Sequence, residues 1–346
     1  ANIIIYEKIL NNIKYNKTNY ITFFCLLILI FVNVFFYRIG EHGSDKSAQI
    51  LIFLLIIEIL IFLAMDNFSN KKLSKIYLLV GIIISLKAFY ILYSILLLIL
   101  FLKIIKKNKF KNSLLFFLKN SYFIPLIILF TLVIKTYFLN TGCLIYPVSF
   151  TCFENFSWSV SKLEVVQLNN WYEQWSKAGA GPNYRIDNPQ IYISNFNWVS
   201  NWIDRYFFNK VSDFLLGITF LIIVTNLFFY SKKKNKINFP NIFMVLFFLS
   251  ILLFEWFYNH PALRYGGYSV IVPIIFLFFS IRLNRYNLEK IKLKKRVNTL
   301  ILITLIIFLG RNFNRIINES VIYSYKPLKD VYYKVDENYF DIPNLI

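Results

Sequence analysis

The sequence predicts an all-α polytopic membrane protein, a transmembrane helical bundle of about nine membrane helices with a long outer loop. Hydrophobic residues make up 58% of the 346 residues and charged residues only 16%, whereas a soluble domain is about 25% charged. The apolar residues gather in runs close to the length that crosses a bilayer. The 38 Lys and Arg residues outnumber the 18 Asp and Glu residues and collect between particular runs. Soluble, disordered and disulfide-scaffold proteins are therefore excluded.

Each apolar run defines a predicted element. The runs lie at residues 20–37, 48–65, 76–102, 122–139, 212–230, 240–257, 267–281 and 298–310. The run 76–102 has room for two short helices that meet at Lys87, and one tilted helix is the alternative. The predicted parts are an N-terminal membrane part at 1–139, an outer-face region at 140–211, C-terminal membrane helices at 212–310 and an outer tail at 311–346.

The basic residues indicate the orientation. With two helices meeting at Lys87, the segments predicted inside carry 23 Lys and Arg against three acids, and those predicted outside carry 14 against twelve. Cytoplasmic loops carry an excess of Lys and Arg. The net charge of +20 is then a topology signal rather than a nucleic-acid surface. We expect an integral membrane protein whose basic segments lie in the cytoplasm, with no nucleic-acid partner.

The loop 38–47, RIGEHGSDKS, gathers polar residues at the predicted outer mouth of a span. Glu41, His42 and Asp45 are its candidate site residues. A carboxylate here can serve as a base for a reacting hydroxyl. The alternative for Asp45, or for Ser44 before it, is to cap the next helix.

Two basic side chains are candidates for binding an anion. Lys87 lies among apolar residues, where a charge is costly and needs a carboxylate or a phosphate as partner, unless the side chain only snorkels. The predicted turn YNHPALRYGGYSV, residues 258–270, holds His260 and Arg264. A guanidinium binds phosphate through two parallel hydrogen bonds, although Arg264 can instead anchor a span at the interface.

The region 140–211 is long for a simple connection and should fold on the membrane surface. It holds five of the six Trp residues, which can form an interfacial belt or contact a ligand. Cys143 and Cys152 lie in it and can pair in an oxidising compartment, whereas Cys25 should stay a free thiol in a span. No metal-type spacing of Cys and His occurs.

The order of these parts resembles the GT-C membrane glycosyltransferases, in particular a poorly characterised bacterial branch. The stretches that carry the resemblance are SDKSAQILIFLLI (44–56), YLLVGIIISLKAFYILYSILLLI (77–99), TGCLIYPVSFTCF (141–153) and HPALRYGG (260–267). The resemblance implies transfer of a sugar from a polyprenyl-phosphate-linked donor to a cell-envelope lipid or polysaccharide acceptor on the outer face, with inversion and without a nucleotide. It also implies an integral protein of the bacterial inner (plasma) membrane, with its active face outside the cytoplasm.

The resemblance also implies roles for the candidate residues. Asp45 matches a later acidic position of the family, and with Glu41 it is the candidate catalytic group. Lys87 matches the family lysine beside the lipid phosphate. Arg264, His260 and His42 are the further candidates for binding that phosphate. The usual base of the family lies one or two spans before the part that begins here, so we expect an N-terminal part to be missing; the chain starts at Ala1 rather than Met.

Other functions stay open at this point. A polysaccharide polymerase or ligase would share the lipid-linked donor and differ in its acceptor. A transporter would be expected to show paired broken helices in inverted repeats, which we do not find. A non-enzymatic membrane scaffold is a further alternative. The sequence identifies no certain cofactor and gives no evidence of a metal requirement, and it leaves a divalent cation open.

Overall fold

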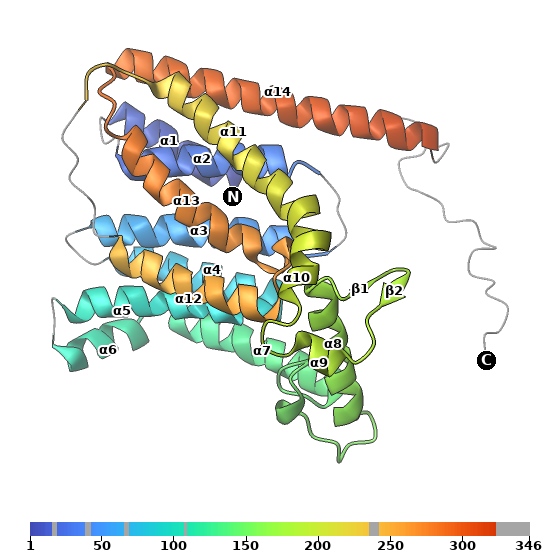
Figure 1. The fold of residues 1–346 in the computed structure, drawn as a ribbon. Helices are drawn as coiled ribbons and strands as arrows, with labels where there is room; N and C mark the ends of the chain where they lie inside the picture. Colours follow the sequence, from blue (N-terminus) through green and yellow to red (C-terminus); the bar gives the residue numbers. More distant parts are fainter. Residues whose placement is uncertain (16–18, 39–42, 66–68, 107–108, 235–241, 323–346) are drawn as a thin grey trace. The chain divides into compact units, whose positions relative to one another are not determined.

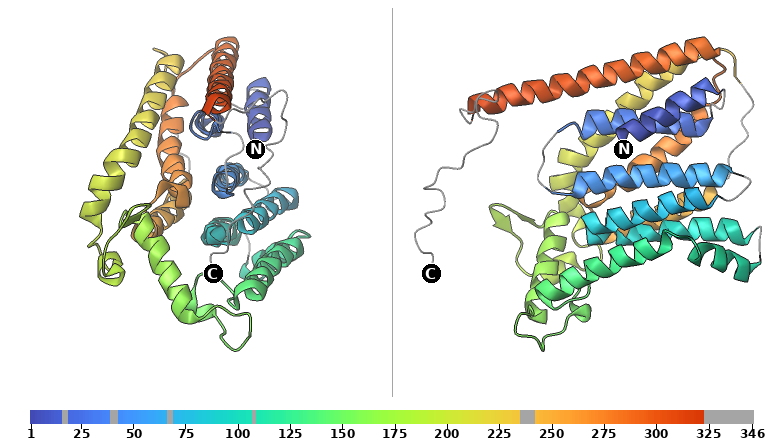
Figure 2. Two further views of the ribbon diagram at one scale, coloured as in Figure 1. Left: turned by 90° about the vertical axis from the view of Figure 1, so that its right-hand side faces the viewer. Right: turned by 180° about the vertical axis from the view of Figure 1, so that it is seen from behind.

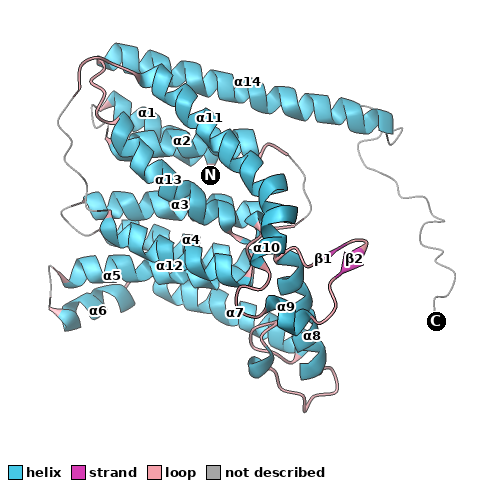
Figure 3. Ribbon diagram, viewed as in Figure 1, coloured by secondary structure: helices cyan, strands magenta, loops and turns pink. Residues whose placement is uncertain are grey.

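The computed structural model describes residues 1–15, 19–38, 43–65, 69–106, 109–234 and 242–322. This part of the chain is mostly helical (Figure 3), which confirms the prediction of a helical protein. The described strands, β1 (Ala180–Gly181) and β2 (Tyr184–Arg185), form one small antiparallel hairpin.

Figure 1 labels the helices in chain order. The first are α1 (Asn2–Lys14), α2 (Tyr20–Phe35), α3 (Asp45–Ala64), α4 (Asn70–Leu86), the 3-10 helix η1 (Ala88–Leu96), α5 (Leu97–Ile105), α6 (Phe110–Leu118) and α7 (Phe123–Thr141). The others are η2 (Ser149–Thr151), α8 (Lys162–Ser176), α9 (Pro189–Ile193), α10 (Val199–Trp202), the π-helix η3 (Ile203–Val211), α11 (Ser212–Phe229), α12 (Phe243–Asn259), η4 (Leu263–Tyr265), α13 (Gly267–Leu283) and α14 (Lys290–Ile322).

Four stretches of the described chain are long and apolar enough to cross a membrane. They are Asp45–Ala64, Phe123–Thr141, Val199–Phe229 and Lys290–Ile322. Shorter apolar helices lie at Tyr20–Phe35, Phe89–Ile105, Phe243–Asn259 and Gly267–Leu283. The finer prediction of about nine membrane helices stays a prediction.

The chain forms two compact units. The first comprises Ala1–Leu29 and Gly43–Arg296, and the second comprises Ile30–His42 and Val297–Ile346. Inside the second unit, α14 is tied to the end of α2: the Arg311 guanidinium carbon lies 3.6 Å from the centroid of the Tyr37 ring, and the Asn312 amide donates to the Tyr37 carbonyl at 2.7 Å. The described candidate residues Asp45, Lys87, His260 and Arg264 all belong to the first unit.

Helix α3 is the most enclosed membrane-length helix of the first unit. Of its most apolar window, 67% is buried. It packs against α4, and α4 packs in turn against α7, so that the three lie side by side (Figure 2). The corresponding window of α7 is 0% buried. An apolar helix with an uncovered surface is suited to contact with lipid.

The carboxylate of Glu58 lies inside this core and is neutralised from two sides. Lys8 of α1 places its Nζ atom 2.9 Å from Glu58 Oε1, and Lys72 of α4 lies 4.0 Å from Oε2. Helix α1 also buries Ile5, Ile9 and Ile13, which are spaced four residues apart and therefore lie on one face of the helix. The ion pair and the apolar stripe together fix α1 on the core.

The long apolar run 76–102 forms two helical pieces that separate at Lys87. Helix α4 ends at Leu86, and Lys87 adopts an extended conformation with φ −160° before η1 begins. The second piece returns toward the start of α4, because Lys103 near its end donates hydrogen bonds to the carbonyls of Phe62 and Met65, just before α4 begins. The chain therefore reverses direction at Lys87.

Candidate functional site

Three breaks between helices meet at one end of the first unit. They are the start of α3 at Asp45, the reversal at Lys87 and the turn 260–266 between α12 and α13, which carries Arg264. Two hydrogen bonds join these breaks. Ser44 occupies the N-cap position of α3, yet its hydroxyl donates to the Leu86 carbonyl at 2.7 Å. The Gln49 amide, one turn into α3, donates to the Arg264 carbonyl at 2.7 Å.

Asp45, Lys87 and Arg264 form what we call the charged cluster. The Lys87 ammonium contacts one carboxylate oxygen of Asp45, and the Arg264 guanidinium lies 3.4 Å from the other. The side chains of Asp45, Lys87 and Arg264 are 14%, 31% and 65% exposed, in that order. One negative charge thus lies between two positive charges, and an arriving anion can reach Arg264 from solvent. The cluster thus holds two basic groups and one carboxylate.

The ring of Tyr265 supports both cations. The Lys87 ammonium lies 5.2 Å from the centroid of this ring, and the Arg264 guanidinium carbon lies 5.3 Å from it. Such cation–π contacts attract the two cations to the ring and help to orient them. Burial raises the pKa of Tyr265, so the ring stays neutral at physiological pH.

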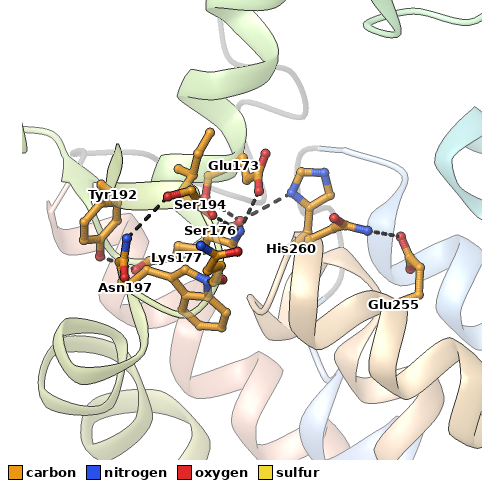
Figure 4. Close-up of polar contacts among 12 residues, drawn as sticks. Glu173, Ser176, Lys177, Tyr192, Ser194, Asn197, Glu255 and His260 are labelled. Carbon is orange, nitrogen blue, oxygen red and sulfur yellow. Dashed lines mark hydrogen bonds and ion pairs between the residues drawn. The ribbon is translucent and has the colours of Figure 1, made fainter. Parts of the chain in front are cut away.

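His260 links the turn to the 140–211 segment. Its Nδ1 lies 3.4 Å from the Ser176 hydroxyl at the end of α8 (Figure 4), and its ring packs on Phe89 and Tyr265. Burial lowers the pKa of His260 to about 4, and the positive charges of Lys177 and Lys87 act in the same direction. The imidazole is therefore neutral at pH 7, and it offers the site hydrogen bonds rather than charge.

Aromatic side chains hold the backbone of the turn 260–266 in place. Their bonds run from Trp202 Nε1 to the Pro261 carbonyl (3.0 Å), from the Leu263 N–H to the Tyr206 hydroxyl (2.8 Å) and from Trp256 Nε1 to the Ala262 carbonyl (3.0 Å). Two of these three rings belong to α10 and η3. The end of the 140–211 segment therefore shapes the loop that presents Arg264.

Lys177 is a buried lysine of the 140–211 segment on which contacts from several helices converge. Its side chain is 1% exposed, and its ammonium lies 2.5 Å from Glu173 Oε1 and donates to the Ile193 carbonyl at 3.0 Å (Figure 4). The rings of Trp198 and Tyr258 lie 5.1 and 5.5 Å from the ammonium. Burial lowers the pKa of Lys177, while Glu173 opposes this change. One cation thus ties α8, α9 and α10 to the end of α12.

The other predicted site residues have different outcomes. Glu41 and His42 lie outside the described residues. The sulfur atoms of Cys143 and Cys152 are bonded to each other, and their Cα atoms are 3.8 Å apart. Cys25 is a free, buried thiol. In the part of the chain that the structure describes, no group of three or more His, Cys, Asp or Glu residues could hold a metal ion.

Sequence reasoning missed several residues of this site. Gln49 lies one helical turn after Asp45, so the two share a face of α3, and this spacing was a usable signal. Tyr265 directly follows Arg264 in the chain. Nothing in the local sequence distinguishes Lys177 from an exposed lysine, because its carbonyl acceptor and one of its rings lie at Ile193 and Trp198.

Comparison with curated proteins and with solved structures finds no match to this chain. A family model with the description "Domain of unknown function (DUF8201)" matches residues 1–272. The match includes the charged cluster, the turn 260–266 and the 140–211 segment. The chain therefore belongs to the DUF8201 family.

Proposed function

We propose that the protein is a membrane glycosyltransferase that moves a sugar from a polyprenyl-phosphate-linked donor to a lipid or glycan acceptor, on the outer face of a bacterial inner membrane. The observation that carries the proposal is the meeting of Asp45, Lys87 and Arg264 at the end of a group of apolar helices. These residues come from three separate breaks in the chain, and they combine a carboxylate with two cations.

The chemistry assigns these charges separate tasks. The acceptor oxygen attacks the anomeric carbon of the donor sugar, and the bond from that carbon to the phosphate oxygen breaks with its electron pair leaving on the phosphate. Lys87 and Arg264 stabilise the negative charge that develops there. A carboxylate takes the acceptor proton, and Asp45 and Glu41 are the candidates for this step. Arg264 is the more exposed cation, so it can leave Asp45 to engage the phosphate.

The proposal places the prenyl chain along the apolar helices that reach the charged cluster. The uncovered apolar surface of α7 supports a membrane location, since such a surface would be unfavourable in water. The proposed topology keeps about nine membrane helices and puts the reversal at Lys87 on the outer face, because this arrangement leaves the basic segments inside.

Binding of a long-chain polyprenyl phosphate to the detergent-solubilised protein tests the proposal. We expect Lys87→Met to weaken binding at least about tenfold, because a charged hydrogen bond to the phosphate is lost. Lys135→Met is the matched control, since Lys135 is also a lysine in an apolar helix but belongs to α7. Equal affinities of the wild type and the folded Lys87→Met variant would contradict the proposed phosphate site.

A further inference from the structure

A row of aromatic side chains on α8 leads toward the charged cluster. The Trp171 ring centroid lies 5.4 Å from that of Trp175 and 5.4 Å from that of Tyr172. Tyr172 is 39% exposed, and Trp171 and Trp175 are half-buried. The three rings therefore form a continuous surface that is partly open to solvent.

Tyr172 connects this row to the site. Tyr172 lies four residues before Ser176, so the two side chains lie on one face of α8. The Ser176 hydroxyl lies 3.4 Å from His260 Nδ1, and the centroid of the His260 ring lies 6.0 Å from that of Tyr265, the ring that supports both cations of the charged cluster. Burial raises the pKa of Tyr265, and the Tyr172 hydroxyl acts in the same direction. The face of α8 that carries Tyr172 therefore leads to the cations.

The type of surface indicates the class of ligand. A sugar ring has C–H groups on its faces and hydroxyls around its edge, so it is matched by an aromatic face that carries a polar group. Tyr172 and Trp171 provide such faces, and the Tyr172 hydroxyl forms no hydrogen bond with the described residues. In an interfacial aromatic belt the rings would instead contact lipid headgroups. Such a belt would have no reason to lie near Lys87 and Arg264.

We propose that Trp171 and Tyr172 bind the sugar ring of the donor while Lys87 and Arg264 hold the phosphate to which that sugar is attached. The inference rests on the proposed function and adds to it a subsite for the transferred sugar. It assigns the donor sugar rather than the acceptor to these rings, because the face of α8 that carries Tyr172 leads through Ser176 and His260 to Tyr265 and the cations.

Two lipid probes separate the sugar contact from the phosphate contact. One is a bare polyprenyl phosphate, and the other is the same lipid phosphate carrying one monosaccharide, prepared with glucose, galactose or N-acetylglucosamine. We expect the wild type to bind at least one sugar-bearing probe about tenfold more tightly than the bare probe. Trp171→Ala and Tyr172→Leu should reduce this ratio to near one while the affinity for the bare probe stays unchanged.

The control is Trp158→Ala. Trp158 is also an exposed tryptophan of the 140–211 segment, at 47% exposure, but it stacks on Phe156 rather than on the aromatic row. In Trp158→Ala, the ratio of the affinity for the sugar-bearing probe to that for the bare probe should equal the wild-type ratio. Because Tyr172 is exposed, Tyr172→Leu tests the inference even where Trp171→Ala fails to fold.

The outcomes distinguish this inference from the proposed function. A preference for the sugar-bearing probe that survives both substitutions would overturn the aromatic subsite and leave the phosphate site intact. A wild type without preference for any of the sugar-bearing probes would overturn it as well. By contrast, a wild type that fails to bind even the bare probe would contradict the proposed function.

Discussion

Breaking the ion pair between Lys177 and Glu173 from the carboxylate side should strongly destabilise the 140–211 segment. Replacing Glu173 with Gln leaves a cation whose side chain is 1% exposed without its carboxylate. Breaking a buried ion pair by removing one partner costs about 3–5 kcal/mol. Lys177 keeps the Ile193 carbonyl and two aromatic rings as partners, so we expect the lower end, about 3 kcal/mol.

The reverse substitution should be milder. Lys177→Met removes the buried charge and fills the same space with apolar atoms, and the carboxylate left behind is 17% exposed and can be hydrated. We expect a cost of about 1 kcal/mol for this variant and a similar cost for the double variant Glu173→Gln/Lys177→Met. The two substitutions should therefore be strongly non-additive, with a coupling energy of about 3 kcal/mol.

Hydrogen exchange of the α8 amides in the solubilised protein measures these differences. A loss of about 3 kcal/mol in local stability should speed exchange roughly 100-fold in Glu173→Gln, and the double variant should restore most of the protection. Unchanged exchange in Glu173→Gln would refute the reasoning. So would a double variant whose loss equals the sum of the two single losses.

The same lysine predicts a dependence on pH. Burial lowers the pKa of Lys177 below its ordinary value of 10.5, so between the lowered pKa and 10.5 the unfolded segment binds more protons than the folded one. Stability therefore rises with pH across this window. Protection of the α8 amides from hydrogen exchange should therefore increase with pH in the wild type relative to Lys177→Met. A difference between the two proteins that is flat or falls with pH would contradict this expectation.

Three further outcomes are expected from other parts of the first unit. Because the pKa of His260 is lowered to about 4, stability should fall by up to about 3 kcal/mol as the pH drops from about 6.5 to about 4, and His260→Asn should flatten this thermal-unfolding profile. Glu58→Gln should lower the unfolding temperature because it removes a buried ion pair, whereas Glu255→Gln should not, since Glu255 has no ion-pair partner among the described residues. Gly142→Ala should cost roughly 1–3 kcal/mol and speed proteolysis near residue 142, because φ is +74° there and a Cβ would lie 2.5 Å from Ser159 Cβ; equal cleavage rates would count against this strain.

The reversal at Lys87 could be read from the sequence, because a lysine in a long apolar run is a costly residue that needs a break or a partner. The order of the motifs also indicated that Asp45, Lys87 and Arg264 belong to one region, and the structure brings them together. The break at Lys87 is marked by the residue itself, whereas the grouping of the three residues depended on the order of motifs along the chain.

Pairings between distant segments could not be read in this way. Glu58 was recognisable as a charge in a span, but its partners Lys8 and Lys72 come from α1 and α4, and sequence spacing does not reveal which helices are neighbours. Lys177 is buried only because the chain after α8 folds back over it. The aromatic row on α8 likewise gains its meaning from the contact between the end of α8 and the turn 260–266, where Ser176 meets His260, 84 positions later in the chain.

The central claim, that the charged cluster binds the donor phosphate, is tested most directly by photo-crosslinking. A polyprenyl phosphate with a photoreactive group close to its phosphate should label peptides that contain Lys87 and the turn 260–266, as identified by mass spectrometry. Excess unlabelled polyprenyl phosphate should abolish this labelling, and Lys87→Met should greatly reduce it while Lys135→Met does not. Labelling that avoids both peptides, or that persists unchanged in Lys87→Met, would contradict the account.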